Sequence, residues 1–176
     1  MCLILVAAAA GLRSSELLAL KSNDINFSTG TIRVDESSDQ RNNGKTGICK
    51  NAAAYRTVVL HDAEGKSAMR ELKKFLQQAP GELVFRSQFG NPLLETTILN
   101  QGLYPVLKQL GLPKGGLHGF RRGCNRRWEL TGLNPAVIRQ QMGHTSQRMT
   151  TLYSGEIPLA QAAEAFSKRS SARIAA

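Results

Sequence analysis

The sequence predicts a mainly α-helical domain with one small antiparallel β-sheet, which is an α+β fold class. Apolar residues recur at helical spacing over most of the chain, and Gly and Pro residues separate the helical segments. Two short segments rich in β-branched residues flank a polar stretch. The chain has 176 residues, 41% of them hydrophobic, and carries no internal repeat or Gly/Ser/Pro-rich linker. We therefore predict a single domain over residues 1–176.

The first elements are two helices separated by a break. Residues 1–10 are almost wholly apolar and predict a buried helix. A secretory signal is the alternative, but the run lacks a basic leading region and is far shorter than the ~20 apolar residues that span a bilayer. The break Gly11-Leu12-Arg13 follows, and Ser14 is expected to cap a second, short helix. Arg13 is thus predicted at a helix junction.

The middle of the chain contains the β element and an amphipathic helix. Residues 31–34 and 56–60 are rich in β-branched side chains and predict a small antiparallel sheet. The polar stretch between them, residues 36–51, is expected to form mobile connections that carry Lys45 and Lys50. Over residues 62–78 apolar positions recur at near-helical spacing with lysines and arginines on the other faces, which predicts a surface helix.

The rest of the chain is predicted to be helical, with breaks at Gly and Pro. The expected helices cover residues 95–110, 118–130, 135–142, 146–153 and 158–168. Within the helix at 118–130, Trp128 is expected to be a core anchor rather than a platform for base stacking. Arg122, Arg126 and Arg127 lie on the same helix, where they either follow a DNA backbone or form a solvated face.

Charge and cysteine usage limit the classes of partner and site. The chain has 23 basic and 13 acidic residues, a net charge of +10, so its partner is expected to be nucleic acid first and an anionic membrane second. Its three cysteines are widely spaced without any C-x-x-C pair, which favours a reducing, cytoplasmic setting. The three histidines do not fall into a metal-ligand spacing. We predict no metal and no cofactor.

Several residues could together cleave a phosphodiester bond without a metal. That reaction needs a nucleophile, cations around the phosphate oxygens, and a proton donor for the departing oxygen. The tetrapeptide His118-Gly119-Phe120-Arg121 places a histidine and an arginine on one face of a helix. Further on, Met142-Gly143-His144 is followed nine residues later by Tyr153. An arginine suits phosphate because its planar guanidinium donates two parallel hydrogen bonds.

Taken in order, these segments resemble the tyrosine recombinase (phage integrase) family. The resemblance rests on Gly11-Leu12-Arg13-Ser14-Ser15-Glu16, Lys45, His118-Gly119-Phe120-Arg121, Met142-Gly143-His144 and Tyr153, and spans nearly the whole chain. It implies the DNA breaking-rejoining fold of the catalytic domain, with double-stranded DNA as the partner. It also implies site-specific recombination or integration through a 3′-phosphotyrosine intermediate, without metal or ATP. The expected setting is the cytoplasm, at the nucleoid, in a bacterial, phage-encoded or mobile-element protein.

The resemblance also implies a role for each residue. Arg13 and Arg121 would clamp the scissile phosphate, and Tyr153 would be the nucleophile. His118 would contact the same phosphate and assist proton transfer, and His144 would bind a non-bridging oxygen from the opposite side. Lys45 would donate a proton to the leaving 5′ oxygen, with Lys50 as the alternative donor. Glu16 is expected to orient Arg13 or to cap the helix start rather than to take part in the chemistry.

Two alternatives to a recombinase stay open on the sequence. A type IB topoisomerase would use the same residues to relax supercoils. A DNA-binding module that has lost catalysis is the other, since Gly123 lies in the interior of the helix that carries Arg121. The N-terminal DNA-clamping domain usual in the family is expected to be absent from residues 1–176, in a fragment or a descendant of a longer protein. The helix at 158–168 is expected to dock on a neighbouring protomer on DNA.

Overall fold

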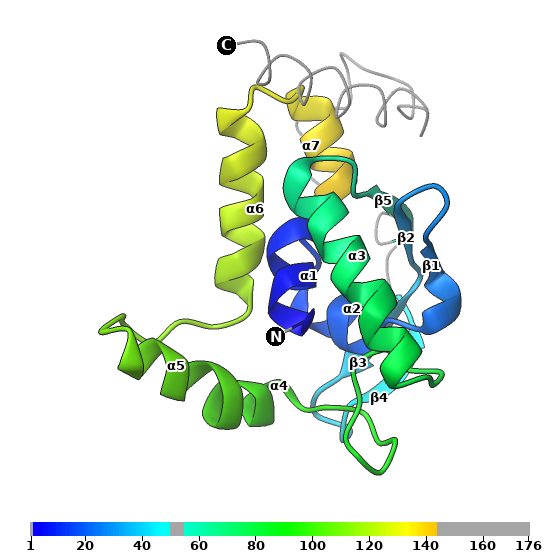
Figure 1. The fold of residues 1–176 in the computed structure, drawn as a ribbon, viewed down its shortest axis with the longest axis vertical. Helices are drawn as coiled ribbons and strands as arrows, with labels where there is room; N and C mark the ends of the chain where they lie inside the picture. Colours follow the sequence, from blue (N-terminus) through cyan, green and yellow to red (C-terminus); the bar gives the residue numbers. More distant parts are fainter. Residues whose placement is uncertain (1, 50–54, 144–176) are drawn as a thin grey trace.

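The computed structural model describes residues 2–49 and 55–143 of the chain (Figure 1). Helices and strands follow one another in this order: α1 (Cys2–Ala10), α2 (Ser14–Ala19), a 3₁₀ turn (Ser22–Asp24), β1 (Ile25–Asn26), β2 (Thr31–Val34), β3 (Glu36–Asp39), β4 (Lys45–Ile48), β5 (Arg56–Val59), α3 (Ala63–Gln78), α4 (Glu95–Thr97), a π-helical stretch (Ile98–Leu103), α5 (Tyr104–Gln109), α6 (His118–Leu130) and α7 (Pro135–Met142). The predicted α+β class is confirmed. The helices predicted at 146–153 and 158–168 lie outside the described residues.

Helix α1 forms the centre of the helical part. It lies between α3 and α6 in Figure 1 and packs against both. Its composition of aliphatic residues and alanines explains this position, because small side chains let neighbouring helices approach closely. The carbonyl oxygens of Ala8 and Ala9 accept hydrogen bonds from Arg127 Nη1 (2.9 Å) and Cys124 Sγ (3.3 Å) on α6. The prediction of a buried helix at residues 1–10 is therefore confirmed for the part described.

The predicted antiparallel pairing of residues 31–34 with 56–60 is confirmed. Strand β2 pairs with β5, with Thr31 opposite Val59, and β1 adds a third strand in the order β1-β2-β5. Ile32 and Val58 are fully buried in the main core, and Val59 is buried in a second cluster with residues of α6 and α7. Arg56 is the first residue of β5 and pairs with Val34 of β2, so the sheet fixes its position beside the core.

The expectation of mobile connections between these strands is wrong for residues 36–48. They form a second, two-stranded sheet in which β3 pairs with β4. The turn is closed by the amide of Gly44, at φ +74°, which donates to Asp39 O, and Ser38 Oγ donates to Gly44 O. Gln40 donates to Ser38 Oγ and accepts from the Glu95 amide (2.7 Å) at the start of α4. Side-chain hydrogen bonds thus stabilise a hairpin whose polar strands have weak intrinsic β-propensity.

Helix α3 begins at a polar junction with α6. The Asp62 carboxylate caps α3 by accepting from the Gly65 amide (2.7 Å), and it also accepts from Arg127 Nη2 and Trp128 Nε1 (3.1 Å each). Trp128 is 2% exposed, so the predicted core anchor is confirmed. Arg127 binds α1 and Asp62, which favours a structural role over contact with a DNA backbone or a place on a solvated face. Arg122 and Arg126 are exposed.

The later helices agree with the sequence except in one place. Residues 95–110 were expected to form one helix, but a π-helical stretch separates α4 from α5. Pro105 at the start of α5 has no amide hydrogen to donate to the preceding turn, which explains the irregular pairing. Helices α6 and α7 have the predicted bounds. Among the described residues, the helices are all too short or too polar to cross a membrane.

Candidate active site

Arg13 lies at the junction of α1 and α2, as predicted. The helix begins at Ser14, so the capping position belongs to Arg13 and not to Ser14 as expected. The reason is Glu16, whose carboxylate accepts from the Arg13 amide (2.8 Å) and so takes the place of a capping side chain. Glu16 Oε1 also accepts from Arg13 Nη1 (2.7 Å). Glu16 thus both caps α2 and orients Arg13, which confirms both parts of the expectation.

Arg121 is a buried cation on the inner face of α6. Its side chain donates to Gly11 O (2.6 Å) and to Met142 O (2.5 Å), and the residue is 4% exposed. Burial, and then the nearby charge of Arg13, lower the pKa of Arg121 to about 10. Arg121 therefore remains positively charged at neutral pH, although its environment disfavours the charge.

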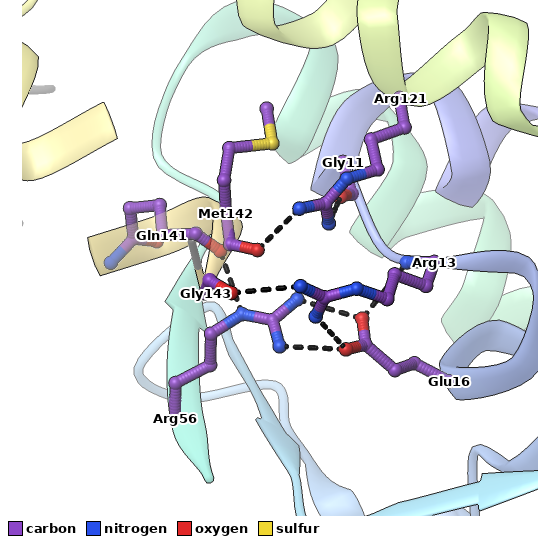
Figure 2. A network of polar contacts seen from close by, with 8 residues as sticks. All are labelled: Gly11, Arg13, Glu16, Arg56, Arg121, Gln141, Met142 and Gly143. Carbon is purple, nitrogen blue, oxygen red and sulfur yellow. Dashed lines mark hydrogen bonds and ion pairs between the residues drawn. The ribbon is translucent and has the colours of Figure 1, made fainter. Parts of the chain in front are cut away.

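Three arginines bind three consecutive carbonyl groups at the C-terminal end of α7, as Figure 2 shows. Arg56 Nε donates to Gln141 O (2.8 Å), Arg121 Nη2 to Met142 O (2.5 Å), and Arg13 Nη2 to Gly143 O (2.8 Å). The last carbonyls of a helix have no partner within the helix and carry the negative end of its dipole, so cations are favoured there. The helix end thus gathers three guanidinium groups from distant parts of the chain.

Glu16 lies between two of these guanidinium groups. Its Oε1 accepts from Arg56 Nη1 (3.0 Å) and its Oε2 from Arg56 Nη2 (2.8 Å), in addition to the bonds from Arg13. The side chains of Arg56 and Glu16 are 4% and 2% exposed. Burial raises the pKa of Glu16, but the hydrogen bonds and charge of Arg56, together with the hydrogen bonds of Arg13, outweigh it and lower this pKa to about 2. Glu16 is therefore an anion at neutral pH.

The other predicted site residues have different positions. His118 is the first residue of α6, one turn before Arg121, and is exposed. Lys45 is the first residue of β4 in the second sheet and is also exposed. His144, Tyr153 and Lys50 lie outside the described residues, although His144 follows Gly143 directly in the sequence. The structure thus brings Arg13 and Arg121 together and leaves His118 and Lys45 accessible.

Reasoning from the sequence missed two residues of this region, Arg56 and Gln141. Gln141 is buried, and its Oε1 accepts from the Val59 amide (2.7 Å), so α7 is attached to β5. An arginine at the start of a strand and a glutamine on a helix are both common, and no spacing in the sequence distinguishes them. Across residues 2–49 and 55–143, no group of three or more His, Cys, Asp or Glu side chains could hold a metal ion.

Residues 1–156 match the phage integrase family. The tyrosine recombinase XerC of Chlamydia caviae is 28% identical over 159 residues, covering 87% of this chain and 46% of the relative. This chain therefore spans about half the length of that curated relative.

The fold agrees with solved structures of integrases. The integrase of the transposon Tn1549 in complex with circular intermediate DNA superposes with a TM-score of 0.69 at 21% identity, covering 95% of this chain and 58% of that one. A lambda integrase from a tetramer bound to a Holliday junction gives a TM-score of 0.58 at 22% identity, covering 90% and 43%. Because the family match runs over residues 1–156 and the fold agrees with it, this chain belongs to the phage integrase family of tyrosine recombinases.

Proposed function

We propose that this protein recombines or integrates double-stranded DNA at specific sites, by cutting and rejoining strands through a phosphotyrosine at Tyr153. The observation that supports the proposal is the convergence of Arg13 and Arg121 on adjacent carbonyl groups at the end of α7. Two cations fixed this close together are suited to one phosphate group, and they come from motifs far apart in the sequence.

In this proposal the arginines stabilise charge that develops during cleavage. As the Tyr153 oxygen bonds to phosphorus, negative charge grows on the non-bridging oxygens, and Arg13 and Arg121 donate hydrogen bonds to them. Each guanidinium has five N–H donors, so donors remain after the contacts to Glu16 and the carbonyl groups. Arg121 keeps its charge at neutral pH, because its pKa is about 10.

Proton transfer is assigned to the histidines and a lysine. The Tyr153 hydroxyl loses its proton to His118 as it attacks, and the bond from phosphorus to the 5′ oxygen breaks. The leaving 5′ oxygen takes a proton from Lys45, or from Lys50 as the alternative. His144 donates a hydrogen bond to a non-bridging oxygen. The products are a 3′-phosphotyrosine and a free 5′ hydroxyl. Religation is the reverse reaction, because the energy of the broken bond is kept in the phosphotyrosine, so no ATP is consumed.

The proposed partners and setting follow from the same assignment. A net charge of +10 suits double-stranded DNA. The solved lambda integrase is a tetramer on a Holliday junction, which supports self-association on DNA for this protein too, with the segment at 158–168 as the contact. The proposed setting is the cytoplasm, at the nucleoid.

The test is a covalent trapping experiment. The chain is incubated with duplexes that carry a nick and a randomised sequence around it, so that the short cleaved strand diffuses away and rejoining is prevented. We expect a covalent protein–DNA adduct that is absent from Tyr153→Phe, and the sequence of the trapped DNA gives the site. A purified chain that forms no adduct would overturn the proposal. Relaxation of a plasmid without that site would favour the topoisomerase alternative.

A further inference from the structure

Arg56 connects β5 to α2 and to α7, the two helices that contribute Glu16 and the carbonyl groups of the candidate active site. It is the first residue of β5, and its guanidinium forms two hydrogen bonds to the Glu16 carboxylate on α2. Its Nε donates to Gln141 O on α7. All three guanidinium nitrogens of Arg56 donate to Glu16 or to Gln141 O, so its donors face these partners and not a DNA phosphate (Figure 2).

The first consequence is electrostatic. Glu16 is paired with Arg13 at 2.7 Å, and a carboxylate this close would cancel most of the positive charge that Arg13 offers to a phosphate. Arg56 binds the same carboxylate at 2.8 Å and neutralises it. With Arg121 included, three positive charges and one negative charge leave the group with a net charge of +2.

The second consequence is geometric. Arg56 holds Gln141 O, while the Gln141 side chain accepts from the Val59 amide and donates to Thr57 O (3.4 Å), so three hydrogen bonds attach the end of α7 to β5. The next two carbonyl groups along the chain are the ones that bind Arg121 and Arg13. Residue 143 then turns the chain at φ +63° into His144. A displacement of this helix end would move the anchors of both phosphate-binding arginines.

We propose that Arg56 is a positioning residue for DNA cleavage, which neutralises Glu16 beside Arg13 and fixes the end of α7 that anchors Arg13 and Arg121. This inference rests on the proposed function of the site. Arg56 acts through these neighbours and does not touch the scissile phosphate. Its removal should therefore slow the chemical step more than it weakens DNA binding.

The experiment compares the rate of adduct formation with the affinity for DNA. The substrate is the nicked duplex recovered by trapping, used at saturation in a single turnover, and the folded fraction of each variant is measured by circular dichroism. Arg56→Gln should lower the cleavage rate per folded molecule about 100-fold, the loss expected from a small misplacement of catalytic groups. Its Kd for the duplex should change less than about threefold, since a guanidinium whose three nitrogens all donate within the protein makes no phosphate contact to lose.

A second substitution separates charge neutralisation from a general packing role. In the wild-type protein, Glu16→Gln should lower the cleavage rate, because it loosens Arg13. In the Arg56→Gln background the same substitution should raise the cleavage rate about tenfold, because it removes a carboxylate that Arg56 no longer neutralises. Arg33→Gln is the matched control, because Arg33 lies on the neighbouring strand β2 and pairs with Asp24 and Asp35 rather than with Glu16 or Gln141. This control should leave the rate unchanged.

The outcomes distinguish the inference from the function on which it rests. If the wild-type chain forms the adduct and folded Arg56→Gln cleaves at the wild-type rate, the inference alone is wrong. It is also wrong if Arg56→Gln loses DNA affinity in proportion to its rate. A wild-type chain without any adduct overturns both. If Arg56→Gln does not fold, Arg56→Lys decides, because it keeps the charge but cannot bond to Glu16 and Gln141 together; a wild-type rate in that variant contradicts the inference.

Discussion

Arg13 and Arg121 donate hydrogen bonds to neighbouring carbonyl groups, those of Gly143 and Met142. One arginine precedes α2 and the other lies near the start of α6, so the end of α7 fixes the spacing between them. Donors that are held in place before the substrate arrives stabilise a transition state without the cost of reorganisation. The helix end is thus the part of the fold on which the electrostatics of the site depend.

The ion pairs of Glu16 predict a pH-dependent stability. The folded pKa of Glu16 is about 2, below its ordinary value of 4.5, so its stabilising effect is complete above pH 4.5 and is lost as the pH falls toward 2. Glu16→Gln should therefore lower the free energy of unfolding by about 3 kcal/mol at pH 7, and the difference should shrink between pH 4.5 and 2. Urea unfolding of both proteins across this range measures it, and a difference independent of pH would contradict the assignment.

The close approach at Gly11 predicts a steric effect on the site. A Cβ atom there would lie 2.8 Å from Met142 Cε and 3.2 Å from Cys124 Sγ, at a backbone φ of +61°. Gly11→Ala should cost about 2–4 kcal/mol, from strain in the left-handed region plus overpacking against the buried Met142. Gly90→Ala is the control, because Gly90 has φ +81° with no atom within 4 Å of the added carbon. Equal losses in urea unfolding would exclude the steric contribution.

The Asp62 junction predicts a large effect from one carboxylate. Asp62→Ala removes the cap of α3 and the acceptor that Trp128 Nε1 and Arg127 Nη2 share, which should cost about 2–4 kcal/mol. Glu64→Ala removes only a half-exposed carboxylate 3.8 Å from Arg127 and should change stability by less than about 0.5 kcal/mol. Thermal unfolding of both variants tests the contrast. Similar losses would mean that Asp62 acts mainly through its charge.

Gly123 predicts a stabilising substitution. It lies on the exposed face of α6, and a Cβ there would have no atom within 4 Å. Gly123→Ala should raise the free energy of unfolding by about 1 kcal/mol, because alanine loses less backbone entropy in a helix. Helix α6 runs unbroken through this position, so glycine here does not interrupt the helix that carries Arg121. A loss of stability on substitution would contradict the open environment.

Local patterns in the sequence predicted the helices that carry the site. Pro135 and Gly143 delimit α7. His118 and Arg121 lie three residues apart and so share one face of a helix, and α6 is that helix. The pairing of β2 with β5 followed from β-branched residues. The hairpin of β3 and β4 could not be predicted in this way, because its polar strands depend on side-chain bonds such as that from the Glu95 amide to Gln40.

The residues that form the site were only partly predictable, for the same reason. Arg13 and Arg121 could be identified because their motifs occur in a recognisable order. Arg56 could not, because its ion pair with Glu16 joins residues 40 positions apart and exists only in the folded chain. Local spacing describes one element at a time, whereas a buried ion pair between elements is a property of their packing.

The bond from Arg13 to Gly143 joins residues 130 positions apart, and the bond from Arg121 to Gly11 joins residues 110 apart. During translation the first of these arginines leaves the ribosome long before the carbonyl that holds it. A nascent chain consequently lacks the assembled cluster of cations until residues 141–143 have been made. The cluster therefore forms only after the end of α7 has been synthesised and has packed against the start of the chain.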